Sequence, residues 1–320
     1  MSDSKITDIP SQGGRTAVIT GTGGLGYEAA LVLAQAGADV IIAGRNPSKG
    51  EEAVARVQRL APNASIQFEQ LDLANLQSIE AFGTRLRTER GSLDLLINNA
   101  AVMAPPKRKT TDDGFELQFG TNYLGHFALT AQLLPLLRKS RHARVVTLSS
   151  IASRDGKINF EDLQAERGYK PMVAYSQSKL ACLMFALELQ RRSEADHWGL
   201  TSVSAHPGVS RTDLLHNGAG PKSTMGLMRT YLWFLFQPAA HGAWPILHAA
   251  TSSEAKAGAY YGPNGFAETR GLPALAKIPT QAKDSATAAR LWDLSERLCG
   301  APFQVAQRGG FNEAASLNLT

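Results

Sequence analysis

The sequence predicts an α/β fold in which one seven-stranded, mostly parallel sheet carries helices on both faces. Two observations support this fold class. Short runs rich in β-branched residues alternate with longer stretches of helical periodicity. The short runs are apolar on both faces, which is typical of parallel strands that are buried on both sides. Since crossovers between such strands share one hand, the sheet is expected to be doubly wound.

Each element is expected from a local pattern. The seven expected strands are residues 16–20, 39–44, 65–71, 93–98, 143–149, 200–206 and 258–262. The expected helices lie between the first six strands, at about residues 24–37, 47–60, 75–89, 115–139 and 172–195. No repeat or linker interrupts this alternation, so we expect one domain from residue 15 to 300. Residues 1–14 are expected to be a flexible polar lead, and residues 301–320 a tail.

The composition argues against several classes of protein. Of 320 residues, 43% are hydrophobic and 19% are charged, which is an ordinary globular balance. The chain has no run of 18 apolar residues and no apolar centre of a secretion signal, so we expect no transmembrane segment. The net charge of +5 is spread out, and the basic run 106–109 has no interleaved aromatic residue, so no nucleic-acid partner is expected. Cys182 and Cys299 form no framework or metal-ligand pattern, which favours a cytoplasmic protein without a metal.

A glycine-rich loop follows the first expected strand. In "ITGTGGLG", Gly21, Gly23 and Gly26 have the G-x-G-x-x-G spacing of Rossmann-type dinucleotide-binding folds. Because glycine has no Cβ atom, the backbone N–H groups at the start of the following helix can approach a phosphate. The alternative is a plain glycine-rich turn between a strand and a helix.

The end of the second expected strand indicates which dinucleotide binds. Arg45 stands where an acidic residue would bind the ribose hydroxyls of NAD(H). A guanidinium can instead bind a 2′-phosphate, so we expect NADP(H) to be preferred and leave NAD(H) open. A solvent-exposed arginine without a ligand is the alternative. Asp72, after the third strand, can accept from the adenine amino group or cap the next helix.

Two further motifs carry chemistry. Tyr175 and Lys179 are four residues apart in an expected helix and therefore share one face. The lysine ammonium is expected to lower the pKa of the phenol from its usual value of about 10, so that the tyrosine exchanges a proton with an alcohol or carbonyl oxygen. A nicotinamide would carry the hydride. Ser149 and Ser150 end the fifth strand, at the sheet edge where such folds bind ligands, and a hydroxyl there can hold the substrate oxygen.

With these motifs, the chain resembles the short-chain dehydrogenase/reductases, in particular the branch that resembles retinol dehydrogenases and the WW-domain oxidoreductase. The resemblance covers about residues 15–300 and rests on "ITGTGGLG", "AGRN", "LDLANLQSI", "LDLLINNAAVM", "TDDGFELQFGTNYLGHFALT", "RVVTLSSIAS", "AYSQSKLA", "HPGVSRTDL" and "YYGPNG". It implies an NADP(H)-dependent alcohol dehydrogenase or carbonyl reductase that acts on an apolar aldehyde, ketone or secondary alcohol. The alternatives are a non-catalytic NADP(H) sensor or scaffold, and an epimerase, dehydratase or double-bond reductase of the same fold.

The resemblance also implies a catalytic quartet. Ser150 would polarise the substrate oxygen, Tyr175 would be the acid/base, Lys179 would lower the tyrosine pKa and bind the nicotinamide ribose, and Asn122 would hold a water that joins Lys179 to a proton relay. Alternatively, Asn122 only satisfies backbone groups inside a buried helix. Ser149 and His206 are expected to be structural.

The same resemblance implies a larger set of cofactor-binding residues. The set is Gly21, Thr22, Gly23, Gly24, Leu25, Gly26, Arg45, Asn46, Asp72, Leu73, Asn99, Ala100, Ala101, Tyr175, Lys179, Pro207, Gly208, Val209 and Thr212. The glycine loop is one residue shorter than the family's T-G-x-x-x-G-x-G, so the expectation of NADP(H) depends mainly on Arg45. Ala101 stands where the family commonly has glycine, and we expect a small effect if its φ is negative.

An apolar stretch, residues 223–247, follows the sixth strand, where members of the family carry a lid. We expect a substrate lid at about residues 209–240 that covers a pocket for a bulky apolar substrate. The side chains expected to line it are Met225, Leu227, Met228, Tyr231, Leu232, Trp233, Phe234 and Phe236. A contact in a homodimer or homotetramer, contact with a membrane surface and burial in the core are the alternatives.

Overall fold

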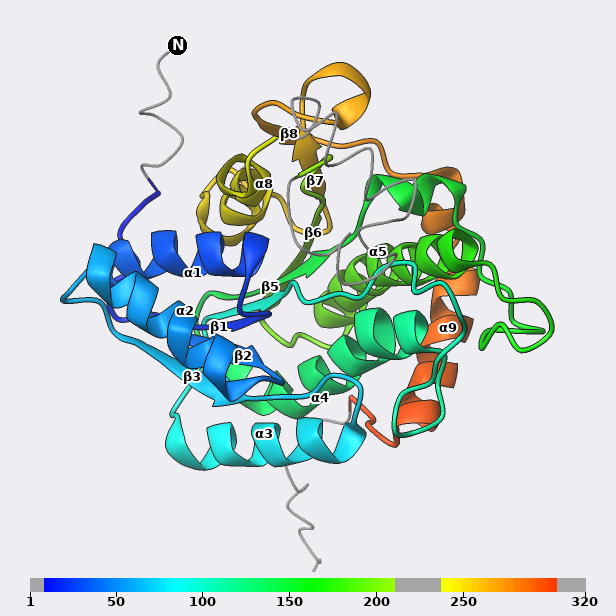
Figure 1. Cartoon of the computed structure of the whole chain (residues 1–320), viewed down its shortest axis with the longest axis horizontal. Coiled ribbons are helices and arrows are strands. Elements are labelled where there is room, and N and C mark those ends of the chain that lie inside the picture. The colour runs from blue at the N-terminus through cyan, green and yellow to red at the C-terminus, as the bar shows by residue number, and fades with distance from the viewer. Residues whose placement is uncertain (1–8, 211–236, 304–320) are drawn as a thin grey trace, which may run out of the picture.

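The computed structural model describes residues 9–210 and 237–303 of the chain. In this part, eight strands form one sheet in the order β3-β2-β1-β4-β5-β6-β7-β8, with helices on both faces (Figure 1). The strands are β1 (Thr16–Thr20), β2 (Asp39–Gly44), β3 (Ile66–Gln70), β4 (Leu95–Asn98), β5 (Ala143–Leu148), β6 (Leu200–Ala205), β7 (Tyr260–Pro263) and β8 (Pro273–Leu275). All neighbouring strands pair in parallel except β7 and β8. The predicted α/β fold with a doubly wound, mostly parallel sheet is confirmed.

The described part of the sheet has one strand more than the seven predicted. The additional strand, β8, pairs antiparallel with β7, so that Tyr261 is opposite Leu275 and Pro263 is opposite Pro273. Its three residues, Pro-Ala-Leu, have no β-branched side chain and are too few to show an alternating pattern. The strand forms because the loop after β7 turns the chain back, so that residues 273–275 lie beside β7. A local sequence pattern does not predict this pairing.

The helices of the described residues are α1 (Gly24–Gln35), α2 (Pro47–Leu60), α3 (Leu76–Glu89), α4 (Gly125–Leu137), α5 (Pro171–Ala195), α8 (Ala239–Thr251) and α9 (Ser285–Cys299). The first five lie close to the predicted ranges. The predicted helix 115–139 divides, however, into a π-helical turn, η2 (Phe119–Leu124), followed by α4. Neither α8 nor α9 was predicted.

Two apolar cores lie on the two faces of the sheet. α1, α2 and α8 pack on one face, and α3, α4, α5 and α9 pack on the other (Figure 1). Neighbouring residues of a strand point to opposite faces. In β1, Ala17 and Ile19 therefore belong to the first core, whereas Val18 belongs to the second. This arrangement explains why the strands are apolar on both faces.

The packed part of the chain extends beyond the expected domain boundaries of 15 and 300. Gln12 is buried, and its backbone N–H donates to the carbonyl of Ala36 at 2.8 Å. Ala301 and Phe303 are also buried, and the Phe303 ring lies 4.4 Å from that of Trp292 in α9. Gln12, Ala301 and Phe303 therefore pack against the domain just outside its expected boundaries.

The apolar stretch 223–247 is only partly described by the structure. Residues 211–236, with Thr212 and the eight side chains expected to line a pocket, lie outside the described residues. Residues 239–247 begin α8, and Ile246 and Leu247 are buried in the core beside α1. This end of the apolar stretch is therefore buried in the core, as one of the alternatives expected, whereas most of the expected lid at about residues 209–240 lies outside the described residues.

The two flanks of residues 211–236 meet at the end of β6. Ser210 pairs with Gln237 in an isolated β-bridge. The side-chain amide of Gln237 donates to the carbonyl of Pro207 at 2.6 Å, and its backbone N–H donates to the carbonyl of Val209 at 3.0 Å. Both flanks are thus fixed to the turn that follows β6.

Candidate active site

The predicted site residues come together at the carboxyl edge of the sheet. In parallel strands these ends share one edge, and the strand order reverses direction between β1 and β4. The loops after these two strands are bound to one another there. The Thr20 hydroxyl accepts the backbone N–H groups of Asn99 at 2.9 Å and Ala100 at 3.0 Å, and the Asn99 amide donates to the carbonyl of Thr20 at 2.7 Å.

The glycine loop has the geometry that phosphate binding requires. Gly21 has a φ of +94°, which favours glycine, and a Cβ atom on Gly26 would lie 2.2 Å from the Gly21 carbonyl oxygen. α1 begins at Gly24, and no described side chain caps its N-terminus. A Cβ atom on Gly23 would meet nothing within 4 Å. Free N–H groups at an open helix N-terminus fit the pyrophosphate of a dinucleotide.

Gly44 and Arg45 lie at the end of β2, where the adenosine ribose would lie. The Thr22 methyl group covers Gly44, since a Cβ atom there would be 2.8 Å from it. Arg45 is exposed directly beyond Gly44. Asn46 is the N-cap of α2, because its side-chain oxygen accepts the N–H of Lys49 at 3.1 Å. These positions leave the Arg45 guanidinium accessible to a 2′-phosphate.

The residues expected near the adenine base have local partners. Asp72 accepts the N–H of Ala74 at 2.9 Å, whereas Asn75 is the N-cap of α3. The alternative that Asp72 caps this helix was therefore wrong. Leu73 is buried, and a Cβ atom on Gly125 would lie 2.4 Å from its carbonyl oxygen. Ala101 does not have a positive φ. The condition under which we expected its methyl group to have a small effect is therefore met.

Tyr175 and Lys179 lie side by side on α5 and are almost completely buried, with exposed fractions of 4% and 3%. Burial raises the pKa of Tyr175 to about 12, and a hydrogen bond with Ser150 acts in the opposite direction. Burial also lowers the pKa of Lys179, whose Nζ atom donates to the carbonyl of Leu148 at 3.1 Å. The expectation of a Tyr175 pKa below its usual value of about 10 was wrong for this structure, because desolvation of the phenol is the largest effect on it.

Ser149 and Ser150 have different partners. Ser150 is the N-cap of a 3₁₀-turn, η3 (Ile151–Asp155), and its Oγ atom accepts the N–H of Ala152 at 3.2 Å. The hydroxyl proton of Ser150 is then available to a substrate oxygen beside Tyr175. Ser149 donates instead to the carbonyl of Lys179 at 2.8 Å, which attaches α5 to the end of β5.

The side chain of Asn122 is committed to other groups of the protein. It lies fully buried in η2. Its Oδ1 atom accepts the N–H of Val102 at 2.8 Å, while Nδ2 donates to the Val102 carbonyl at 2.9 Å and to Ser178 Oγ at 3.0 Å. These contacts favour the alternative that the side chain satisfies neighbouring groups, and they place the loop after β4 against α5.

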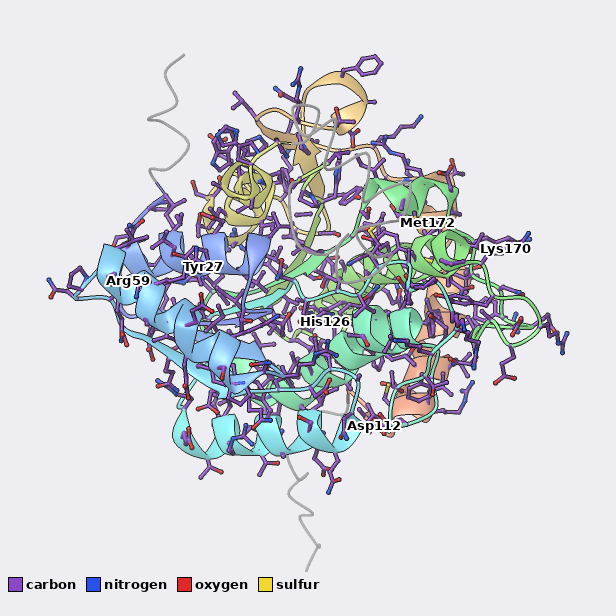
Figure 2. The ribbon with its side chains drawn as sticks, viewed as in Figure 1. Tyr27, Arg59, Asp112, His126, Lys170 and Met172 are labelled. Carbon is purple, nitrogen blue, oxygen red and sulfur yellow. The ribbon has the colours of Figure 1, made fainter. Side chains whose placement is uncertain are left out.

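His126 is a site residue that the sequence reasoning missed. It lies near the centre of the molecule, at the start of α4 (Figure 2). Its Nδ1 atom lies 2.8 Å from the carbonyl oxygen of Asn122, and its Nε2 atom lies 2.9 Å from Thr20 Oγ1. Burial lowers the pKa of His126 to about 4. Its position four residues after Asn122, on the same helical face, was the available signal.

The turn after β6 is held by the segment that follows β7. Gly208 has a φ of +64°, and a Cβ atom on it would lie 2.3 Å from the carbonyl oxygen of Thr269. The N–H of Val209 donates to the same oxygen at 2.8 Å. His206 is fully buried and its Nε2 atom lies 2.9 Å from Glu268 Oε2. Glu268 was not among the predicted residues.

Within residues 9–210 and 237–303, no helix combines the length and apolarity that crossing a membrane requires. In the same ranges, no three histidine, cysteine or acidic side chains lie close enough together to hold a metal ion.

Comparisons with known proteins agree with this arrangement. Residues 15–220 match the family model of the short chain dehydrogenases. Mouse retinol dehydrogenase 13 is 40% identical over 293 residues, which covers 90% of this chain and 84% of that protein. Mouse polyprenol dehydrogenase is 38% identical over 300 residues, with coverages of 92% and 86%. The crystal structure of an uncharacterised protein from Mycobacterium paratuberculosis is 39% identical, with a TM-score of 0.77 over 94% of this chain and 98% of that one.

Proposed function

The chain belongs to the short-chain dehydrogenase/reductase family, and from this premise we propose that it transfers a hydride between NADP(H) and an apolar aldehyde, ketone or alcohol. The family makes it a nicotinamide-dependent dehydrogenase. The observation that carries the proposal is the contact between the Ser150 hydroxyl and the buried Tyr175 phenol, one helical turn from Lys179. The sheet edge where they lie also holds the open glycine loop.

The residues of the chain have separable tasks. The nicotinamide, when bound, supplies or accepts the hydride. The Ser150 Oγ atom accepts from Ala152 and can donate its own proton to the substrate oxygen. The phenol of Tyr175 has a pKa of about 12 and is protonated at neutral pH, so it can donate a proton to a carbonyl oxygen. Lys179 is held beside it at the end of β5.

The choice of NADP(H) is supported by Arg45. Its guanidinium is exposed at the end of β2, and an arginine there can bind a 2′-phosphate with charge-assisted hydrogen bonds. The glycines of the loop, the N-terminus of α1 and the turn at residues 207–209 would hold the remainder of the dinucleotide.

An apolar substrate is supported by the surroundings of the phenol. Met103 and Ala104 are buried against Tyr175, and Ala152 packs on the same cluster. Two of the similar proteins are named for retinol and polyprenol, which are both long isoprenoid alcohols. We therefore propose that the substrate is a bulky apolar alcohol or the corresponding carbonyl compound.

Two measurements test the proposal. Fluorescence titration with NADPH and NADH identifies the cofactor, and a panel of apolar and polar carbonyl compounds then identifies the substrate class. Tyr175→Phe should keep cofactor binding and lose about 100- to 10,000-fold in turnover, since the variant lacks the acidic proton. Turnover by Tyr175→Phe at the parent rate would refute the assignment of the proton donor. Binding of NADPH without turnover of any compound would instead favour a sensor or scaffold.

A further inference from the structure

A closed loop at residues 264–272 places Glu268 in an unusual backbone conformation. The loop is closed by the N–H of Asn264, which donates to the Leu272 carbonyl at 2.8 Å, and by the N–H of Gly265, which donates to the Arg270 carbonyl at 2.9 Å. Ala267 and Glu268 have φ values of 50° and 59°. Left-handed conformations are unfavourable for residues with a Cβ atom and persist where surrounding contacts enforce them. The contacts of Glu268 are therefore expected to be strong.

Glu268 binds three donors with its two carboxylate oxygens. Oε2 accepts from His206 Nε2 at 2.9 Å and forms an ion pair with Arg154, and Oε1 accepts the N–H of Lys277 at 3.1 Å. Burial acts to raise the pKa of this carboxyl, but the hydrogen bonds and the charge of Arg154 lower it to about 2. The side chain is 21% exposed and ionised at neutral pH.

Gly208 and Glu268 together fix the tautomer and the orientation of His206. The Nδ1 atom of His206 accepts the N–H of Gly208 at 3.2 Å, so the ring proton must be on Nε2, where Glu268 accepts it. The ring packs against Tyr260, at 5.1 Å between centroids. A Cβ atom on Gly262 would lie 2.0 Å from Nε2, so only glycine leaves room for the ring there. One line of contacts thus runs from Glu268 through His206 to Gly208.

A second line of contacts runs from Glu268 to the segment of Ser150. Arg154 belongs to η3, the turn for which Ser150 is the N-cap. Its guanidinium binds the Glu268 carboxylate and also donates to the Ala267 carbonyl at 3.3 Å. Gln281 donates to the carbonyl of Arg154 at 2.7 Å and supports the same turn. One carboxylate therefore binds both the turn after β6 and the turn after β5.

We propose that Glu268 is a positioning residue for the reaction, which holds the turn at residues 207–209 and the Ser150 segment in one fixed arrangement. This inference rests on the proposed function, in which these two segments adjoin the nicotinamide and the substrate oxygen. Glu268 itself acts only through His206 and Arg154. A small displacement of either segment would reduce the rate of hydride transfer more than it would weaken substrate binding, because reaction requires a narrower geometry than binding.

Glu268→Met tests the inference, with Glu69→Met as its matched control. Glu69 lies on β3, at the opposite edge of the sheet from β7 and β8, and its side chain, which is 22% exposed, forms an ion pair with Arg85 at 3.5 Å. We expect Glu268→Met to reduce kcat about 10- to 100-fold with less than about a threefold change in the substrate KM. Glu69→Met should leave both constants unchanged. Equal kcat values for Glu268→Met and the parent enzyme would overturn the inference.

A second readout does not depend on turnover. Proton and nitrogen NMR of the histidine rings should show the Nε2–H tautomer of His206 in the parent, with its Nε2–H proton shifted downfield by the hydrogen bond to the Glu268 carboxylate. Glu268→Met should lose this downfield shift, and an unchanged shift of the Nε2–H proton would overturn the link through His206. If the parent enzyme shows this tautomer but reduces no carbonyl compound, the proposed function fails and no reaction remains for Glu268 to position.

Arg154→Met interrupts only the second line of contacts and serves if Glu268→Met does not fold. It should reduce kcat and leave the His206 tautomer unchanged. In the double variant Glu268→Met/Arg154→Met, the fold-loss of kcat should be clearly smaller than the product of the fold-losses in the two single variants. The reason is that both substitutions interrupt the same contact between Glu268 and Arg154. Multiplicative losses would show that the two side chains act independently and would contradict the inference.

Discussion

The Nε2 atom of His126 lies 2.9 Å from the hydroxyl oxygen of Thr20, which directly precedes the glycine loop. That hydroxyl already accepts two backbone N–H groups from the loop after β4, so it donates its proton to the imidazole. His126 Nδ1 then carries the ring proton and donates to the carbonyl of Asn122. One neutral imidazole thereby joins the loops after β1 and β4 to η2, which packs against α5.

We predict that His126→Phe destabilises the protein by about 2–3 kcal/mol, because it leaves the Thr20 hydroxyl and the Asn122 carbonyl with fewer buried partners. Urea unfolding at pH 7 measures this free energy. His142→Phe is the control, since His142 is exposed. Combining His126→Phe with Thr20→Val should cost less than the sum of the two single losses. A variant as stable as the parent would show that this hydrogen bond contributes little.

The same histidine predicts a pH dependence of stability. Burial lowers the pKa of His126 from 6.5 to about 4, so the unfolded chain binds a proton in this pH window that the folded chain does not. Its contribution is therefore present above about pH 6.5 and is lost as the pH falls to about 4, by about 3 kcal/mol in total. The free energies of unfolding of the parent and His126→Phe should therefore converge by this amount as the pH falls across the window. Free energies that stay parallel across the window would mean that the histidine titrates normally in the folded protein.

The predictable parts of the fold are those with local patterns. The strands from β1 to β7 and the helices from α1 to α5 each carry their own periodicity, and the doubly wound arrangement follows from crossovers of one hand. β8 has no pattern of its own. α9 does bury Ala288, Leu291, Trp292 and Ser295 at helical spacing, and this signal was overlooked.

The site could be predicted only as far as residue types and strand ends determine it. Ser150 and Tyr175 were found because one ends a strand and the other belongs to a motif. The raised pKa of Tyr175 depends on how completely neighbouring elements bury it, which spacing does not show. The contact between Glu268 and His206 joins residues that are 62 positions apart in the sequence. It depends on the left-handed backbone of Ala267 and Glu268, which no periodic pattern in the sequence predicts.

The Tyr175 pKa of about 12 predicts how the rate depends on pH. For carbonyl reduction the phenol must be protonated, so kcat should stay level between about pH 6 and 9. For alcohol oxidation the phenolate is required, and kcat should rise about tenfold for each pH unit in the same range. Both profiles can be recorded with one substrate pair at saturating cofactor. If raising the pH halves the reduction rate before about pH 8 is reached, the pKa of Tyr175 in the working enzyme is much lower than 12.

Two glycines of the loop provide a matched pair of substitutions. Gly26→Ala places a methyl group 2.2 Å from the Gly21 carbonyl oxygen, so we expect a loss of about 1–3 kcal/mol in the free energy of unfolding. Gly23→Ala meets no atom within 4 Å and keeps a φ of −133°, so its stability should equal that of the parent. Its methyl group should nevertheless weaken NADPH binding about tenfold, or 1.4 kcal/mol, because it occupies the open side of the loop. Unchanged binding by Gly23→Ala would place the phosphates elsewhere.

Arg45→Asp should change which dinucleotide the protein prefers. The carboxylate would repel a 2′-phosphate and can accept hydrogen bonds from ribose hydroxyls, so the ratio of the NADPH and NADH dissociation constants should shift toward NADH by at least about tenfold. Arg59→Asp makes the same change of charge at the outer edge of the molecule (Figure 2), near the end of α2, and should leave the ratio unchanged. Thr22 of the shortened glycine loop covers Gly44, which precedes Arg45. An unchanged ratio in Arg45→Asp would therefore show that this loop, and not Arg45, selects the dinucleotide.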